Sequence, residues 1–165
     1  MTTAIIALEP QHWNEVKTIY EQGLATGIAS FETKSPSWVD WDRSHLTVCR
    51  FVAIQRKKVV GWIALSPVSS RCVYGGVAEI SVYVHEDYRK MGVGKLLLAT
   101  TVAASEQKGY WTLQAGIMPQ NISSIKLHEA AGFRVVGYRE KISKINEQWT
   151  DNLLLERRSK VVGIQ

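Results

Sequence analysis

The hydrophobic and polar positions at the start of the chain predict a strand followed by two helices. "TAIIAL" at 3–8 is a short apolar run typical of a strand. Ser35 is the expected N-cap of a second helix within 35–46, with Pro36 at the first helical position. Between them, Pro10 opens a stretch in which apolar residues recur at helical spacing, at Trp13, Val16, Ile19, Tyr20 and Leu24.

The middle of the chain predicts antiparallel strands, and the second half alternates strands with helices. "RFVAIQ" and "VVGWIAL" flank the polar "RKK", which indicates a hairpin, and "VAEISVYVH" at 77–85 is rich in β-branched residues. Gly109 and Gly132 are expected to end two helices. The remaining expected elements are a helix at 93–108, a strand at 110–117, a helix over "NISSIKLHEAAGF", and strands near 133–138 and 150–156. This order predicts one α/β domain with a mixed sheet over 1–165.

Composition adds few constraints to this picture. The chain has 165 residues, about the size of one domain, and its formal charge of +5 permits an anionic partner without identifying one. Cys49 and Cys72 are isolated, which suits a reducing compartment, and no metal-ligand spacing occurs. The longest N-terminal apolar run is too short for a signal peptide or a membrane span. We therefore expect a cytoplasmic protein with no metal and no membrane partner.

The stretch "YRKMGVGK" at 88–95 is the strongest chemical signal in the chain. A P-loop needs a glycine where Arg89 stands and a Ser or Thr where Leu96 stands, so that interpretation fails. A dinucleotide fingerprint needs a third glycine where Leu97 stands. A helix N-terminus after a strand, with Gly92 and Gly94 allowing close approach, would still bind a pyrophosphate. A solvated basic turn is the alternative.

The surroundings of this stretch favour the phosphate site. Arg89-x-x-Gly92-x-Gly94 follows "EISVYV" and precedes "NISSIKLHEAAGF", a combination that resembles the GNAT superfamily of acetyl-CoA-dependent N-acetyltransferases. The resemblance implies a central mixed sheet of six or seven strands flanked by about four helices, with a splay between the fourth and fifth strands. It also implies that acetyl-CoA is held by the loop residues Arg89, Lys90, Met91, Gly92, Val93, Gly94 and Lys95.

Four further segments sharpen the resemblance. "FETKSPSWVDW", "AEISVYV", "LHEAAGF" and "QWTDN" are together similar to the phosphinothricin acetyltransferase branch of the superfamily. That similarity implies acetylation of the α-amine of phosphinothricin, methionine sulfoximine or methionine sulfone, and a homodimer. A GNAT enzyme for another amine, such as a protein N-terminus, a lysine or a polyamine, is the alternative.

Acetyl transfer needs a base for the amine and a polarised thioester carbonyl. Glu79 is the candidate base; by itself it could be a glutamate facing water at the start of a strand, and the resemblance assigns the catalytic role. The backbone of Val82, Tyr83 and Val84 is expected to contact the pantetheine arm. Asn121 is expected to cap the following helix and also to bind the cofactor.

His128 is the second candidate catalytic residue. Many GNAT enzymes have Tyr at this position, and a His could protonate the leaving thiolate or relay the proton of the amine. A core histidine on a helix face is the alternative. The resemblance assigns substrate selection to Phe31, Arg71 and Tyr83, and it gives Trp149 and Asp151 no distinct role.

Two other function classes stay open at this point. A nucleic-acid-binding module would suit the basic balance, but only "RKK" and "ERRSK" form basic clusters, so we expect no nucleic-acid partner. A non-catalytic acyl-CoA sensor would share the cofactor site and lack turnover.

Overall fold

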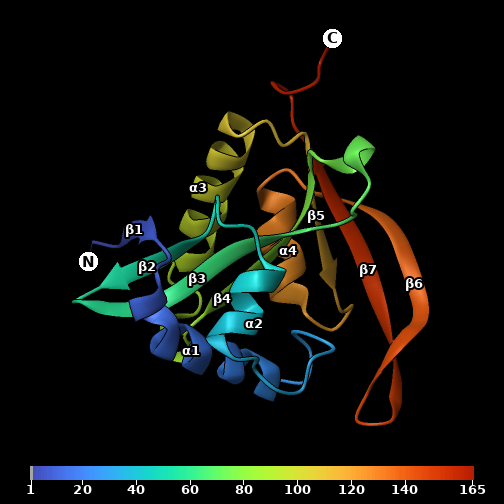
Figure 1. The fold of residues 1–165 in the computed structure, drawn as a ribbon. Helices are drawn as coiled ribbons and strands as arrows, with labels where there is room; N and C mark the ends of the chain where they lie inside the picture. Colours follow the sequence, from blue (N-terminus) through green and yellow to red (C-terminus); the bar gives the residue numbers. More distant parts are fainter. Residues whose placement is uncertain (1) are drawn as a thin grey trace.

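The computed structural model describes residues 2–165, and its centre is one seven-stranded sheet (Figure 1). The strand order is β1-β2-β3-β4-β5-β7-β6, and every neighbouring pair is antiparallel except the parallel pair β4 and β5. The strands are β1 (Ala4–Ala7), β2 (Phe51–Gln55), β3 (Lys58–Pro67), β4 (Val77–Val84), β5 (Thr112–Ile117), β6 (Arg134–Ile145) and β7 (Gln148–Arg158). The mixed α/β class expected from the sequence is confirmed.

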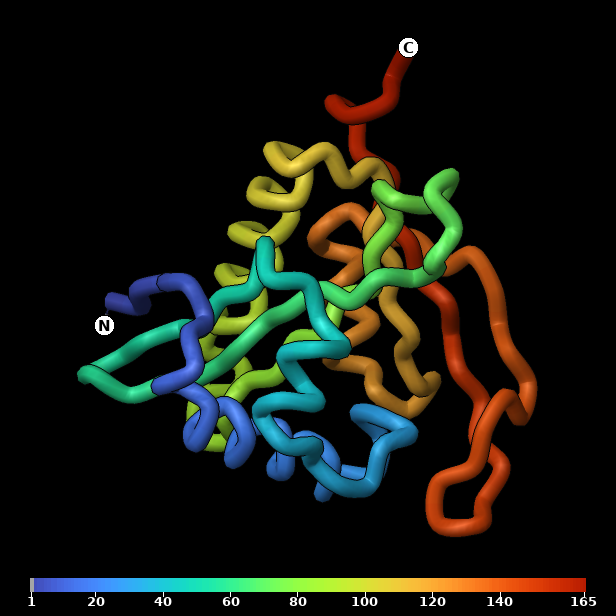
Figure 2. Tube along the Cα trace, in the orientation of Figure 1, coloured from blue at the N-terminus to red at the C-terminus, as the bar shows by residue number. Residues whose placement is uncertain are grey.

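The helices lie on both faces of the sheet (Figures 1 and 2). One core contains Trp41 and Trp62 and joins α1 and α2 to the first face, while the other contains Leu97 and joins α3 and α4 to the opposite face. The helices are α1 (Trp13–Ala25), α2 (Trp38–Ser44), α3 (Val93–Gln107) and α4 (Ile122–Ala130), with 3-10 turns η1 (Pro10–His12), η2 (Cys72–Tyr74) and η3 (Glu86–Tyr88).

The parallel strands β4 and β5 separate after a short contact. They pair only where Val77–Glu79 meets Thr112–Gln114, although β4 continues to Val84 and β5 to Ile117. From Ile80 onward, the edge of β4 that faces β5 has no strand partner within residues 2–165. The splay that the family resemblance implied is therefore present, and it leaves backbone N–H and C=O groups free along one side of β4.

The expected N-cap of α2 was wrong by two residues. Ser37, not Ser35, has the extended backbone of an N-cap, and its hydroxyl accepts a hydrogen bond of 3.2 Å from the backbone N–H of Asp40. The hydroxyl of Ser35 instead donates to Glu21 at 2.6 Å. Pro36 therefore precedes the cap and is not the first helical residue.

The last two strands are longer than the sequence pattern predicted. Strands β6 and β7 extend past the rest of the sheet as a hairpin arm (Figure 1), turned by Asn146 and Glu147 with φ of +47° and +66°. Most of β6 is exposed, so no alternation of buried and polar positions marks it. Within residues 2–165, no helix combines the length and the apolar character needed to cross a membrane.

Candidate active site

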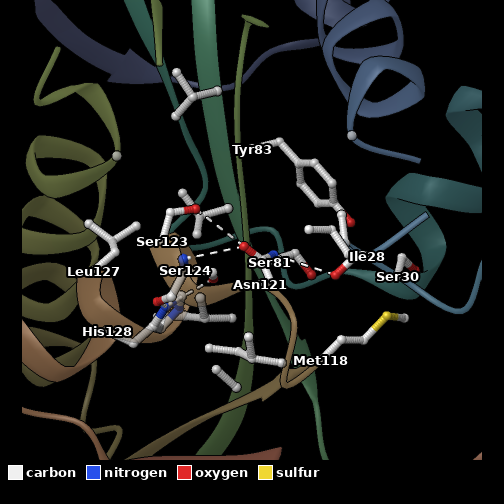
Figure 3. A pocket seen from close by; sticks show the side chains of 18 of the residues that line it. Ile28, Ser30, Ser81, Tyr83, Met118, Asn121, Ser123, Ser124, Leu127 and His128 are labelled. Atoms are coloured by element: carbon white, nitrogen blue, oxygen red, sulfur yellow. Dashed lines mark hydrogen bonds between the residues drawn. The ribbon is translucent and has the colours of Figure 1, made fainter. Parts of the chain in front are cut away.

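A cavity of about 650 Å³ lies at the splay between β4 and β5 (Figure 3). Successive residues of β4 alternate between the two faces of the sheet, and the cavity is lined by both sets. Glu79, Ser81 and Tyr83 face the α1 side, whereas Ile80, Val82 and Val84 face the α3 side. The cavity therefore passes through the sheet and connects its two faces.

The loop before α3 forms one end of the cavity. Lys90 and Gly92 have φ of +62° and +83°, which turns the chain sharply into the helix. Within the described chain, no backbone N–H from Arg89 to Lys95 donates to a protein acceptor. Free amides at a helix N-terminus, with Arg89, Lys90 and Lys95 lining the same end, are groups chemically suited to an anion. The side chain of Met91 is 57% exposed and lies outside the lining.

Glu79 lies on the α1 face at the point where the two strands part. Its Oε2 accepts a hydrogen bond of 3.1 Å from Nε2 of Gln114, its direct partner on β5. The side chain is partly buried and lines the cavity. The carboxylate is therefore held at one oxygen, and the other oxygen is not used by a hydrogen bond within residues 2–165.

Tyr83 is held rigidly on the same face by aromatic neighbours. Its ring stacks on Trp62, its partner on β3, with centroids 4.9 Å apart and planes 17° apart, and Tyr20 packs against its edge. Gly23 of α1 makes room, because a Cβ there would lie 2.5 Å from two ring carbons. Burial, with smaller contributions from Tyr20 and Glu32, raises the pKa of the Tyr83 phenol strongly, so its hydroxyl stays protonated.

Asn121 joins the N-terminus of α4 to the loop between α1 and α2 (Figure 3). Its Oδ1 accepts from the backbone N–H of Ser124 at 3.3 Å, which confirms the expected N-cap. Its Nδ2 donates to the carbonyl of Ile28 at 3.5 Å. Phe31 and Ser30 belong to the same loop and line the cavity, so this loop forms the wall opposite the sheet.

His128 lies on the α3 and α4 side, on the opposite face from Glu79. It is 2% exposed, and its Nδ1 lies 2.7 Å from the carbonyl oxygen of Ser124, which can only accept. The proton is therefore on Nδ1, and Nε2 carries a lone pair without a hydrogen-bond partner in the described chain. Burial lowers the pKa of His128, against the smaller opposing effect of the Ser124 carbonyl. At neutral pH the ring is an acceptor and not an acid.

Arg71 is not brought to this cavity. It lies in the exposed loop before η2, with its guanidinium carbon 5.4 Å from the ring centroid of Tyr74. Its expected part in substrate selection stays a prediction, without support from the cavity. Arg139 of β6 lines the cavity instead, together with Asn152 and Met118. The hydrophobic pattern carries no signal for Arg139 and Asn152, because their position depends on how β6 and β7 pair, whereas Met118 directly follows β5.

Comparison with known proteins decides the family. Residues 13–133 match the acetyltransferase (GNAT) family. The chain belongs to the GNAT family. It is 29% identical to the phosphinothricin N-acetyltransferase of Alcaligenes faecalis over 148 residues, which cover 86% of this chain and 75% of that protein.

Two more relatives agree with this assignment. The L-methionine sulfoximine/L-methionine sulfone acetyltransferase of Salmonella typhimurium is 34% identical over 73 residues, 44% of this chain and 43% of that protein. A phosphinothricin acetyltransferase from Sinorhizobium meliloti, solved in complex with AcCoA, has a TM-score of 0.90 and 25% identity, covering 100% of this chain and 92% of its own. The family and the branch suggested by the sequence motifs are confirmed, and this GNAT protein is an acyltransferase.

Proposed function

We propose that this GNAT protein transfers an acetyl group from acetyl-CoA to the α-amine of a small amino-acid-like acceptor. The proposed acceptors are phosphinothricin, methionine sulfoximine and methionine sulfone, because enzymes for these compounds are among its relatives. The observation that carries the proposal is the cavity through the sheet. A loop with free amides forms one end, and a carboxylate on the other face of the sheet lies where an amine would arrive.

The cofactor would lie on the α3 side and reach through the splay. The free amides from Arg89 to Lys95 would bind the pyrophosphate, with Arg89, Lys90 and Lys95 neutralising its charge. The unpaired edge of β4 at Val82, Tyr83 and Val84 would hydrogen-bond the pantetheine arm as an added strand would. Asn121 would contact the same arm from α4. An amide of that edge would also polarise the thioester carbonyl.

Glu79 would act as the general base for the amine. An aliphatic amine is mostly protonated at neutral pH, and the resulting ammonium group cannot attack a carbonyl. A carboxylate on the acceptor side must therefore take a proton from it, directly or through a water. The amine nitrogen then bonds to the carbonyl carbon as the C–S bond breaks, and the electron pair leaves with sulfur. Gln114 would fix the orientation of the carboxylate during this step.

His128 would accept at Nε2 the second proton that the amine nitrogen loses as the amide forms, and would pass it to the departing thiolate. Its Nδ1 proton is engaged with Ser124, and burial favours the neutral ring by lowering the pKa, so Nε2 offers only a lone pair. This argues against direct protonation of the thiolate by a resting imidazolium. Phe31 and Tyr83 would shape the acceptor space. We propose that residues 1–165 act as one catalytic domain and work in the cytoplasm as a homodimer.

A thiol-release assay tests the proposal. Acetyl-CoA is held saturating, and the acceptors are phosphinothricin, methionine sulfoximine, methionine sulfone, a polyamine, a lysine peptide and a peptide with a free N-terminus. We expect release to depend on acceptor and to be fastest with the amino-acid analogues. Thiol release only with peptides or polyamines would show that the acceptor is one of those amines and not an amino-acid analogue. Binding of acetyl-CoA without release for any acceptor would favour a sensor.

A further inference from the structure

Arg139 is an unpaired cation at the acceptor side of the cavity. Within residues 2–165, its guanidinium makes neither an ion pair nor a hydrogen bond, whereas Arg50, Arg134 and Arg157 all pair with carboxylates. Among the described lining residues, the other lysines and arginines are Arg89, Lys90 and Lys95 of the loop before α3. Arg139 therefore stands apart from the cations suited to phosphate, and it retains its capacity to bind an anion.

The strand register places Arg139 on the same face of the sheet as Glu79. Glu79 bonds the side chain of Gln114, so both point to the α1 face, and Gly116 follows two residues later on that face. A Cβ on Gly116 would lie 3.0 Å from the side-chain amide of Asn152, so Asn152 points the same way. Arg139 is the direct partner of Asn152 and therefore shares this face.

An irregularity in β6 directly follows Arg139. Arg139 pairs with Asn152 and Ser143 pairs with Thr150, so residues 140–142 oppose Asp151 alone. Lys141 within this bulge has φ of +48°. Bulges of this kind redirect side chains next to sites, and they need a partner for the backbone groups that leave the ladder.

Asp151 supplies that partner on the opposite face. Its Oδ1 accepts from the backbone N–H of Lys141 at 2.7 Å, and its Oδ2 accepts from the hydroxyl of Tyr138. These contacts lie on both sides of Arg139 along the strand. The hydrogen bond from Tyr138 is the main cause that lowers the pKa of Asp151 below its usual range, and the one from the backbone of Lys141 adds to it. The carboxylate therefore stays charged.

We infer that Arg139 binds the carboxylate of the acceptor and that Asp151 is the positioning residue that directs it. The inference rests on the proposed function and adds the residue that recognises the carboxylate of the acceptor, with the amine at Glu79 and the anion at Arg139. A guanidinium binds a carboxylate through two parallel hydrogen bonds, which selects this group over a neutral amide. Arg139, and not Arg71, is then the specificity residue.

The test is a thermodynamic cycle that removes the Arg139 side chain and the carboxylate of the acceptor, separately and together. Thiol release is measured for L-methionine sulfone and for its carboxamide, in which the only anionic group is removed. In the parent protein we expect kcat/KM for the carboxylate to exceed that for the carboxamide by about 10- to 100-fold. Arg139→Ala should reduce this ratio to about one to three, and Arg139→Lys should leave an intermediate ratio. Arg71→Ala should keep the parent ratio.

Asp151→Asn tests the positioning role separately. It should raise KM for the carboxylate about three- to tenfold with kcat nearly constant, and leave KM for the carboxamide unchanged, a pattern that general destabilisation does not produce. Equal KM changes for both acceptors would overturn the role of Asp151. The role of Arg139 would be overturned if Arg139→Ala kept the parent ratio of kcat/KM between carboxylate and carboxamide. It would also be overturned if Arg71→Ala lost that ratio instead.

A binding measurement separates this inference from the proposed function. Methionine sulfone is titrated calorimetrically into protein saturated with CoA, where no transfer can occur. Weaker binding to Arg139→Ala supports the inference even if the parent transfers no acetyl group, which would remove only the proposed function. Binding that is equal in the two proteins, or absent in both, overturns the inference even if acetylation proceeds.

Discussion

Gln114 donates its side-chain amide to Oε2 of Glu79 over 3.1 Å, at the last residue pair that β4 and β5 share before they part. The hydrogen bond joins the two strands where the cavity opens, and it orients a carboxylate that lines the cavity. The point at which the sheet splits and the candidate base are therefore the same place in the molecule. Replacing Gln114 tests whether the charge state of Glu79 limits the reaction.

Gln114→Glu should move the acidic limb of the pH profile of kcat/KM to higher pH. Two carboxylates within hydrogen-bond distance cannot both ionise easily. The doubly ionised pair therefore forms at a pH about one unit or more higher. Gln107→Glu, at the end of α3 and outside the cavity lining, adds the same charge as a control and should leave the limb in place. An unmoved limb in Gln114→Glu would argue against catalysis by Glu79.

Gly92→Ala should weaken CoA binding without blocking the cavity. Gly92 has φ of +83°, and apart from its neighbours along the chain no atom of residues 2–165 lies within 4 Å of an added Cβ, so the cost is backbone strain of about 1 kcal/mol. Gly109, beyond the other end of α3, has φ of +85° and the same open space, which makes Gly109→Ala a matched control. Both variants should lose similar unfolding free energy in urea titrations.

Only Gly92→Ala should raise the calorimetric Kd for CoA, by about 5- to 20-fold, because a shifted loop no longer presents its amides together. Pantetheine, which lacks the pyrophosphate, should bind both variants equally. Equal CoA affinity in the two variants would show that the loop before α3 does not hold the pyrophosphate.

Gly23→Ala should change the acceptor site through Tyr83. The new Cβ would lie 2.5 Å from Cδ1 and Cε1 of the Tyr83 ring, and the ring is confined on its other sides by Trp62 and Tyr20. The ring must therefore shift toward the cavity. We expect KM for methionine sulfone to rise about tenfold or more while the Kd for CoA stays within about twofold.

The control for Gly23→Ala is Gly27→Ala, just beyond the C-terminus of the same helix, where an added Cβ meets no described atom within 4 Å apart from its chain neighbours. Its φ of +72° brings a strain cost without displacing Tyr83. If both variants change KM for the acceptor to the same degree, the contact between Gly23 and Tyr83 does not set the acceptor space.

His128 should make the protein less stable as the pH falls below neutral. Its pKa is lowered by burial in the folded state from an ordinary value of 6.5, so the unfolded chain binds the proton first. The contribution of His128 to the free energy of unfolding is therefore fully present above about pH 6.5, and it declines as the pH falls toward the folded-state pKa. Urea titrations from about pH 7.5 to 5 should show a shallower decline in His128→Asn, which removes the titrating group.

His45 has a lowered pKa for the same main reason, burial, so some decline should persist in His128→Asn. The double variant with His45→Asn should flatten the curve further. A slope identical in His128→Asn and the parent would mean that the buried ring is not neutral in the folded protein.

The sequence could predict the parts of the site that are local in the chain. The spacing of the glycines and basic residues from Arg89 to Lys95 signals a turn into a helix, and the neighbouring motifs are needed to favour a phosphate site there; Asn121 signals a helix cap by its place before α4. The strands β2 to β5 were found because burial makes them apolar on at least one face. Local pattern and local geometry agree in these segments.

The parts that depend on distant pairing could not be predicted. Arg139 enters the cavity only through the register of β6 with β7 and the bulge opposite Asp151, and most of β6 is exposed, so no hydrophobic alternation marks it. The sequence predicts the cap of α2 at Ser35 because Pro36 suits the first helical position, but the hydroxyl of Ser35 bonds Glu21 of α1 and the cap is Ser37. Both outcomes follow from tertiary contacts.

The most direct test of the central claim is the rate of acetyl transfer by Glu79→Gln as a function of pH, with acetyl-CoA prebound and methionine sulfone as acceptor. The account predicts a loss of about 100-fold or more at neutral pH with an unchanged Kd for CoA. It also predicts that the loss shrinks as the pH passes the pKa of the acceptor amine, because a free amine no longer needs a base. Parent-like transfer by Glu79→Gln at neutral pH would contradict the account.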